Sequence, residues 1–266
     1  MENFKFKKAF GQNFLQDHHI IERIVSETDI KENSLVIEVG PGSGVLTKEL
    51  SKYAKDVLTY EIDIRLEDIL DENLKDCHNV HVIFDDFLKR NLKEDIKDFS
   101  YDNLYVVANI PYYITTPILT KIIESKIPFK KVTIMIQKEV GERFTANVGT
   151  REYGSITVFL NYYFNIKKLF IVNRNAFMPK PNVDSVVISL NAKENKNKVL
   201  DEEVFFKLIR DAFHFKRKNL RNNLKNYDLV IVQNVLSKYN KDLTSRAEEL
   251  GLNIFVDMSN ALTKKN

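Results

Sequence analysis

Five short apolar runs, rich in β-branched and aromatic residues, recur along the first half of the chain and constrain its fold most. They lie at Leu35–Val39, Val57–Tyr60, Val80–Phe84, Leu104–Ala108 and Val132–Ile136. Each has the length and composition of a buried strand. Helical patterns fall between most of them, at Val45–Tyr53, Leu66–Leu74 and Pro117–Ser125. This alternation predicts an α/β domain with a doubly wound parallel sheet and right-handed crossovers.

The second half of the chain changes character after a short polar stretch. Late strands, forming an antiparallel edge of the sheet, are predicted at Thr157–Phe164, Leu169–Val172 and Ser185–Leu190. The polar segment Ala192–Lys198 is predicted to be a linker. Apolar residues at helical spacing then follow at Glu202–Phe213, Arg217–Leu224, Leu229–Leu236 and Phe255–Leu262. We therefore expect one domain over residues 1–194 and a small all-helical domain over residues 195–266.

Composition excludes several classes of protein. Hydrophobic residues make up 44% and charged residues 29% of the 266 residues, as in an ordinary protein with a buried core. Cys77 is the single cysteine, which excludes an intrachain disulfide and a thiolate-rich metal site. No apolar run approaches the roughly 18 residues of a membrane span, and Met1–Lys8 lacks the apolar core of a signal peptide. We expect a cytoplasmic protein that binds neither a membrane nor a metal.

A glycine-rich turn directly follows the first predicted strand. Gly40, Gly42 and Gly44 are spaced so that the backbone can turn tightly and approach a ligand closely. The dinucleotide fingerprint would need a third glycine where Val45 stands, so that fingerprint fails. The pattern instead favours a nucleoside ligand without a pyrophosphate, namely S-adenosylmethionine rather than NAD. The alternative is an ordinary tight turn between a strand and a helix.

Acidic residues end the next two predicted strands. Glu61 stands about twenty residues beyond the glycines, where a carboxylate can accept both ribose hydroxyls. Asp85 and Asp86 end the third strand, where one carboxylate can accept a hydrogen bond from the amino group of the cofactor's adenine. A solvated acid is the alternative for Glu61. A metal is the alternative for the pair, although no histidine or third acid stands at a suitable spacing nearby.

The segment Asn109–Tyr112 carries the chemistry at the end of the fourth strand. The amino nitrogen of adenine is a poor nucleophile, because its lone pair is delocalised into the ring. The side-chain oxygen of Asn109 and the carbonyl of Ile110 or Pro111 can accept its two hydrogens and favour pyramidalisation. Pro111 stiffens the segment, and Tyr112 offers a face for stacking an extruded base. The alternative is a common junction between a strand and a turn.

Segments along the whole chain resemble the KsgA/RsmA-type ribosomal RNA adenine dimethyltransferases. They are Phe10–Asp17, Glu38–Gly44, Glu61–Asp63, Asp85–Phe87, Asn109–Ile118, Gln137–Val140, Phe177–Ser185, Ala212–Leu224 and Arg246–Leu250. The resemblance implies a Rossmann-like S-adenosylmethionine methyltransferase domain. It also implies in-line methyl transfer to adenine N6, repeated to give the dimethyl product.

The same resemblance implies roles for particular residues. Those expected to bind S-adenosylmethionine are Asn13, Leu15, Gly40, Gly42, Glu61, Asp86 and Asn109. Asn109, Pro111 and Tyr112 would serve the target adenine, with Phe177 as a second aromatic wall. Ordinary core packing is the alternative for Phe177. The family often has glycine where Asp85 stands, which leaves the choice between Asp85 and Asp86 open.

A basic block points to a nucleic-acid partner. Between Phe205 and Lys225 seven lysines and arginines stand against one acid, Asp211, although the net charge of the chain is only +3. The residues expected to contact RNA phosphates are Lys7, Lys8, Lys216, Arg217, Lys218 and Arg221. A solvated helix face is the alternative. By resemblance, the substrate is two adjacent adenosines in a hairpin loop near the 3′ end of 16S ribosomal RNA, within a precursor 30S subunit.

Competing functions remain open on sequence grounds. The housekeeping small-subunit enzyme is favoured, because resistance methylases match poorly in the C-terminal region. The alternatives are a macrolide-resistance methylase acting on 23S ribosomal RNA and a non-catalytic ribosome-assembly factor. A small-molecule methyltransferase would leave the basic helical region unexplained. We expect a monomer.

Overall fold

The computed structural model describes residues 13–111, 114–193 and 198–264. The chain divides into two compact units. The first comprises the chain to Gly141 together with Lys167–Ala192, and the second comprises Glu142–Ile166 together with the chain from Lys193. The predicted boundary after residue 194 lies beside the last crossing between the units. Residues 142–166, which the sequence pattern did not separate from the sheet, belong to the second unit.

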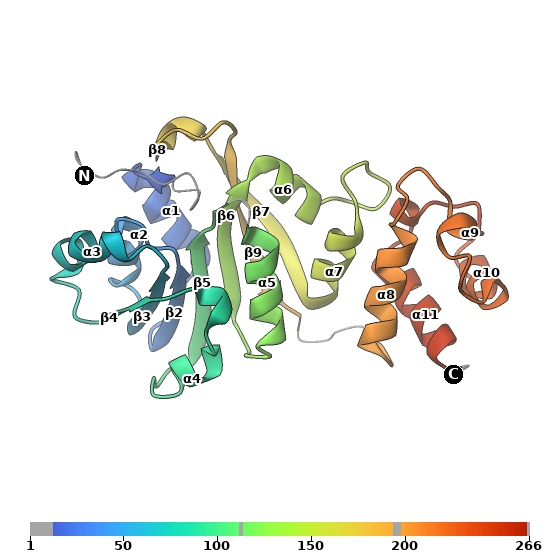
Figure 1. The fold of residues 1–266 in the computed structure, drawn as a ribbon, viewed down its shortest axis with the longest axis horizontal. Helices are drawn as coiled ribbons and strands as arrows, with labels where there is room; N and C mark the ends of the chain where they lie inside the picture. Colours follow the sequence, from blue (N-terminus) through green and yellow to red (C-terminus); the bar gives the residue numbers. More distant parts are fainter. Residues whose placement is uncertain (1–12, 112–113, 194–197, 265–266) are drawn as a thin grey trace. The chain divides into compact units, whose positions relative to one another are not determined.

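The first unit is built on a seven-stranded sheet (Figure 1). Its spatial order is β4 (Val80–Phe84), β3 (Asp56–Glu61), β2 (Ser34–Val39), β5 (Asn103–Asn109), β6 (Lys131–Gln137), β9 (Ser185–Ala192) and β7 (Phe164–Val172). The first five are mutually parallel, and β9 runs antiparallel to β6. The five predicted strands and the doubly wound sheet are therefore confirmed, with a late antiparallel strand beside them.

Helices in the first unit follow the strands or precede the sheet. They are α1 (His18–Thr28), α2 (Val45–Leu50), α3 (Glu67–Leu74), α4 (Leu92–Ile96), α5 (Thr115–Glu124) and α6 (Lys138–Phe144), the last of which ends in the second unit. Asp17 caps the start of α1 by accepting hydrogen bonds from the backbone of His19 and Ile20. Ile21 and Ile24 of α1 are buried in one cluster with Val36 of the sheet. Each such side chain contributes roughly 1.5–3 kcal/mol when fully buried.

A two-stranded sheet holds the start of the described chain close to the glycine turn. It consists of β1 (Phe14–Leu15) and β8 (Phe177–Met178), with Leu15 opposite Phe177. The Phe14 ring packs on Leu66 and Leu70, and a Cβ built on Gly42 would lie 2.9 Å from that ring. The segment before α1 is thus fixed at the edge of the sheet where the strands end.

The second unit is helical. It contains α7 (Ser155–Tyr163), α8 (Glu202–Ala212), α9 (Leu220–Asn223), α10 (Leu229–Ser237) and α11 (Leu252–Thr263). Phe205 of α8 and Phe255 of α11 lie fully buried in one hydrophobic cluster. The helical character predicted for the region after the linker is confirmed. Among the described residues, no helix is long and apolar enough to cross a membrane, and no cluster of histidine, cysteine and acidic side chains could hold a metal.

One predicted element was wrong and another was too long. Thr157–Phe164 was predicted as a strand, but its residues up to Tyr163 form α7. A short apolar run does not distinguish a buried helix from a strand, and here Thr157 Oγ1 accepts the Gly154 N–H at 3.1 Å, which supports a helix start. Arg217–Leu224 was predicted as a helix, but only Leu220–Asn223 is helical. The Asn223 amide donates to the carbonyls of Ala212 and Phe215, which stabilises a turn instead.

Candidate functional site

The carboxyl ends of four parallel strands surround one cavity in the first unit. The cavity has a volume of about 260 Å³. The sequence-predicted residues that line it are Asn13, Leu15, Gly40, Gly42, Glu61, Asp85, Asp86, Asn109 and Pro111. Because the carboxyl ends of parallel strands meet at one edge, residues far apart in sequence converge here.

The glycine turn forms the floor between β2 and α2. Gly40, Gly42 and Gly44 have φ of 75°, 59° and 80°, a region that side chains rarely adopt. The Gly40 N–H donates to the Tyr60 carbonyl at 2.9 Å, which joins the turn to β3. A Cβ built on Gly40 would meet no atom within 4 Å, so this glycine faces open space. The turn is a cradle that allows a ligand to approach the backbone.

Glu61 is a buried carboxylate held in one orientation. Its side chain is 5% exposed and accepts hydrogen bonds from the backbone N–H of Asp63 at 2.9 Å and of Gly42 at 3.3 Å. Burial raises the pKa of Glu61, and the two backbone donors oppose that rise. A carboxylate fixed in this way can accept from a pair of ligand hydroxyls without reorienting.

Glu38 is a cavity residue whose role the sequence analysis did not identify. It is 1% exposed, it lines the cavity, and it accepts a hydrogen bond from Thr47 Oγ1 at 2.6 Å. Burial raises the pKa of Glu38 to about 8, because the hydrogen bond from Thr47 offsets only part of the desolvation. Burial thus favours the protonated form of the Glu38 carboxyl beside the glycine turn.

Glu38→Gln is expected to raise the free energy of unfolding at high pH relative to the unchanged protein. The stability from neutral Glu38 is fully present below its ordinary pKa of 4.5 and is lost as the pH rises through about 8. Glutamine does not ionise, so the difference should grow by up to about 1.4 kcal/mol per pH unit across that window. Urea unfolding of both proteins at pH 5, 7 and 9 measures the difference. A constant difference would show that Glu38 ionises normally.

The acid pair at the end of β4 divides into two different environments. Asp85 Oδ1 accepts the backbone N–H of Asp86 at 2.7 Å, and Arg90 Nη1 donates to Asp85 Oδ2 at 3.3 Å. These donors lower the pKa of Asp85. Asp86 Oδ1 accepts the Leu88 N–H at 3.0 Å, and its side chain is 26% exposed. Asp86 is therefore the better candidate for contact with a ligand.

Asn109 ends β5 with its amide group oriented by the segment before α1. Its Nδ2 donates to the backbone carbonyl of Asn13 at 3.2 Å. With the amino end used in this way, the side-chain oxygen is the end left to accept hydrogen bonds. The neighbouring Ile110 N–H donates to the Met135 carbonyl at 3.2 Å, which fixes the strand end. Tyr112 lies outside the described residues.

Phe177 is buried in the hydrophobic core of the first unit. It is 5% exposed, belongs to the hydrophobic cluster that contains Leu15, and is not among the described residues lining the cavity. The structure thus shows core packing for this ring, and its contact with a target base stays a prediction. Ile62, by contrast, lines the cavity with a 53% exposed side chain. An exposed aliphatic residue next to Glu61 suits the face of a flat ring, and the sequence analysis did not single it out.

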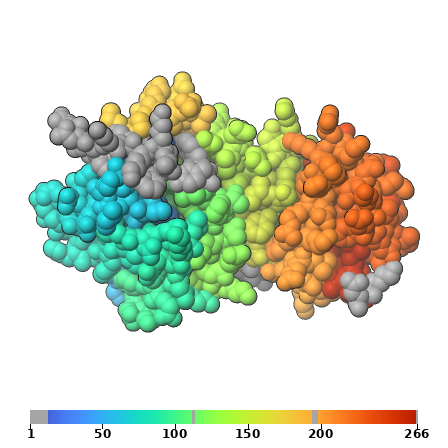
Figure 2. Space-filling model, in the orientation of Figure 1, coloured from blue at the N-terminus to red at the C-terminus, as the bar shows by residue number. Residues whose placement is uncertain are grey.

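The predicted RNA-binding residues that the structure describes all lie in the second unit. Lys216, Arg217, Lys218 and Arg221 are exposed, in a segment that belongs to the orange surface in Figure 2. Lys216 Nζ donates to the Arg151 carbonyl at 2.9 Å, which ties two loops of this unit together. Lys7 and Lys8 lie outside the described residues.

A doubly wound parallel sheet with a glycine cradle and two strand-end acids around one cavity defines a Rossmann-like domain. The model of a protein family described as "Ribosomal RNA adenine dimethylase" matches residues 3–264 of the chain. The chain belongs to this family.

Curated relatives and solved structures agree with that assignment. Two proteins named "Ribosomal RNA small subunit methyltransferase A" are similar, at 44% identity in Streptococcus gordonii and 43% in Bacillus mycoides; each match covers 97% of this chain and 92% of the relative. A dimethyladenosine transferase from Plasmodium falciparum has a TM-score of 0.80 at 28% identity, covering 95% of this chain and 98% of that one. The 23S rRNA methyltransferase ErmE has a TM-score of 0.76 at 26% identity, covering 94% and 100%.

Proposed function

We propose that the protein uses S-adenosylmethionine to dimethylate N6 of two adjacent adenosines near the 3′ end of 16S ribosomal RNA. The observation that carries this proposal is the position of Asn109, whose side chain is oriented at a cavity that also contains Glu61 and Asp86. Relatives at 43–44% identity bear the name of a small-subunit ribosomal RNA methyltransferase. The reaction would take place in the cytoplasm during small-subunit biogenesis.

The residues around the cavity fit S-adenosylmethionine. Gly40 leaves open space where a Cβ would stand, Glu61 can accept from ribose hydroxyls, and Asp86 can accept from the adenine amino group. Asn13, Leu15 and Asn109 complete the proposed set. When bound, S-adenosylmethionine supplies an activated methyl group on a sulfonium.

Asn109 and Pro111 would prepare the target base. The Asn109 oxygen and a neighbouring carbonyl accept the two amino hydrogens, which draws the nitrogen lone pair out of conjugation and aims it at the incoming methyl. Catalysis then comes mainly from orientation and from acceptors placed for the charge that develops on nitrogen. After the transfer, the methylated nitrogen carries a positive charge and is acidic enough to lose a proton to water. Tyr112 and Phe177 are the proposed aromatic partners of the base.

We propose residues 1–194 as the methyltransferase domain and residues 195–266 as the RNA-recognition domain. The exposed basic residues Lys216, Arg217, Lys218 and Arg221 would contact phosphates, together with Lys7 and Lys8. The adenosine must be single-stranded or flipped for its amino group to be reached. We further propose that the protein acts as a monomer on a precursor 30S subunit.

Replacing Lys218 and Arg221 together by alanine is expected to weaken RNA binding and to reduce its salt dependence. Each lost phosphate contact should lower the slope of log K against log salt by about 0.7–0.9. Binding of the 3′ hairpin of 16S ribosomal RNA is measured by fluorescence anisotropy from 50 to 300 mM salt. The control is the double variant Lys238→Ala with Lys264→Ala, which removes two exposed charges outside the segment. Equal slopes for the two double variants would contradict a phosphate-binding role.

A methyl-transfer assay tests the proposed function. Labelled S-adenosylmethionine is offered with unmodified small subunits, large subunits or free ribosomal RNA, and the product is mapped by mass spectrometry. Dimethyladenosine confined to the small subunit supports the proposal. The likeness to ErmE makes a 23S resistance methylase the second candidate, and label only in large-subunit RNA would favour it. Cofactor binding without transfer to any RNA would instead favour a non-catalytic assembly factor.

A further inference from the structure

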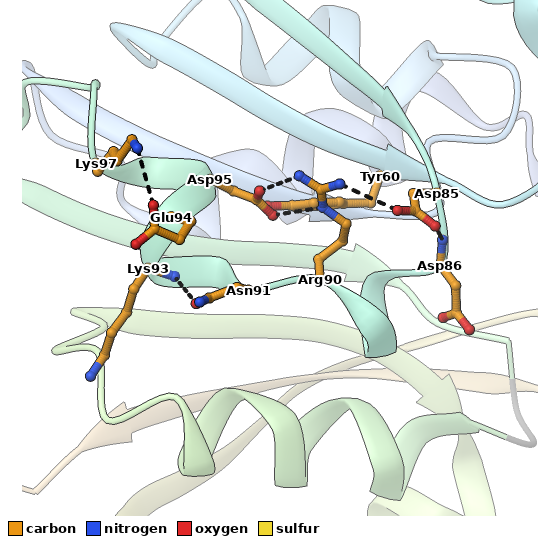
Figure 3. Close-up of polar contacts among 9 residues, drawn as sticks. All are labelled: Tyr60, Asp85, Asp86, Arg90, Asn91, Lys93, Glu94, Asp95 and Lys97. Carbon is orange, nitrogen blue, oxygen red and sulfur yellow. Dashed lines mark hydrogen bonds and ion pairs between the residues drawn. The ribbon is translucent and has the colours of Figure 1, made fainter.

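A buried carboxylate on α4 connects the two acidic strand ends without lining the cavity. The Asp95 side chain is 4% exposed, and neither Asp95 nor Arg90 is among the described residues that line the cavity. Asp95 Oδ2 accepts from Tyr60 Oη at 3.0 Å and from Arg90 Nε at 3.1 Å. Arg90 Nη2 also donates to Asp95 Oδ1, which completes a two-point contact (Figure 3).

The other end of the Arg90 guanidinium reaches the acid pair. Its Nη1 donates to Asp85 Oδ2 at 3.3 Å, and Asp85 Oδ1 accepts the Asp86 N–H at 2.7 Å. Figure 3 shows Asp85 pointing toward Arg90 and Asp86 pointing away from it. The order of contacts is therefore Asp95, Arg90, Asp85 and then the backbone of Asp86.

Asp95 also reaches the strand that bears Glu61. Tyr60 precedes Glu61 on β3, and its ring lies edge-on to Phe87 with centroids 5.3 Å apart. The Tyr60 carbonyl accepts the Gly40 N–H. The buried Asp95 carboxylate thus contacts Tyr60, the residue before Glu61, which is the proposed ribose-binding acid. Through Arg90 it also holds the turn that bears Asp86, the proposed adenine-binding acid.

The exposure of the contact between Arg90 and Asp85 indicates that this contact orients Asp85 rather than stabilising the fold. Asp85 is 43% exposed, and an ion pair that accessible contributes little to stability. The two-point contact with buried Asp95 is different, because a charge-assisted bidentate contact fixes the plane of the guanidinium. Arg90 therefore presents Nη1 at a defined position, and small displacements of a ligand-binding group have large effects on binding and rate.

We propose that Arg90, anchored by Asp95, is a positioning residue that holds the Asp85–Asp86 turn for recognition of the exocyclic amino group of the cofactor's adenine. The proposal rests on the proposed function, because it assigns the adenine of S-adenosylmethionine to Asp86. It also explains why an acid at Asp85 is useful here: its carboxylate accepts from both Arg90 and the turn. The expected consequence is selectivity for a 6-amino purine over a 6-oxo purine.

Binding of two ligands to the full chain tests this proposal without an activity measurement. The probes are S-adenosylhomocysteine and S-inosylhomocysteine, which differ at purine position 6 and in the proton that the 6-oxo ring carries on N1. Calorimetric titration compares the unchanged protein with Asp85→Ala and Arg90→Lys. Lysine keeps a charge beside Asp95 but cannot span both acids, and Asp85 is exposed enough for alanine to leave the fold intact. Lys97→Ala is the control, because Lys97 pairs with Glu94 on the exposed side of α4.

Both variants are expected to bind S-adenosylhomocysteine about 10-fold more weakly, while the affinity for S-inosylhomocysteine changes less than about twofold. The control should match the unchanged protein with both ligands. Equal weakening of both ligands would show a merely structural role and overturn the proposal, as would unchanged selectivity in the variants. Failure of the unchanged protein to bind either ligand would instead overturn the proposed function.

Discussion

Asn109→Ala is expected to reduce the turnover number for methyl transfer by on the order of 100-fold or more, the usual effect of removing one aligned polar group at a reacting centre. The affinity for S-adenosylhomocysteine should fall far less, because Glu61, Asp86 and the glycine cradle remain. The physical reason is that alanine removes the acceptor aimed at the target amino group. Single-turnover rates on unmodified small subunits, together with calorimetric titration of S-adenosylhomocysteine, separate the two effects.

The same strand offers a matched control. Asn103 is the first residue of β5, and Asn109 is the last. Asn103→Ala therefore removes an identical side chain at the amino end of the same strand. This variant should retain the full rate. Asn109→Asp keeps an oxygen acceptor but loses the donor to the Asn13 carbonyl, so an intermediate rate is expected. A full rate for Asn109→Ala would remove Asn109 from the chemistry.

Much of the fold and of the cavity could be predicted, because the strands of a parallel sheet all end at the same edge. Residues that follow different strands in the sequence therefore lie close together in space. Each of the five apolar runs in the first half of the chain forms one parallel strand, and the residues that follow it had to lie at the carboxyl edge. Gly40, Glu61, Asp86 and Asn109 were found in this way, and all four line the same cavity. The spacing of the three glycines predicted a tight turn, and in the structure each of them has a positive φ.

Other features depend on contacts that no local pattern contains. The Asn13 carbonyl meets Asn109 across 96 positions in the chain, and Asp95 meets Tyr60 across 35. Glu38 belongs to the segment that resembles the family, but only the packed sheet reveals that its carboxyl is buried. The strand predicted at Thr157–Phe164 failed for a related reason. Its apolar residues are buried in the second unit, and tertiary packing rather than periodicity decides between helix and strand there.

Glu61→Gln is the other substitution with a large expected effect, and it acts on binding. The dissociation constant for S-adenosylhomocysteine should rise roughly 10- to 100-fold, because hydrogen bonds to a charged group contribute about 1.5–3 kcal/mol. The glutamine has nearly the same shape as the glutamate, yet it replaces one acceptor oxygen by an NH₂ group. That group would face either a backbone N–H or a ribose hydroxyl, where an acceptor is needed.

Stability separates this loss of binding from a loss of fold. Burial raises the pKa of Glu61, so the ionised carboxylate is costly in the folded protein without ligand. The stability from the protonated form is present below the ordinary pKa of 4.5 and is lost as the pH rises through the raised value. In the glutamine variant, removing the cost of ionisation offsets the acceptor that one backbone N–H loses, so the variant should stay folded at pH 7 while binding poorly, which its melting temperature measures. Glu72→Gln, an exposed change on α3, should alter neither property. A Glu61 variant that binds normally would place the ribose elsewhere.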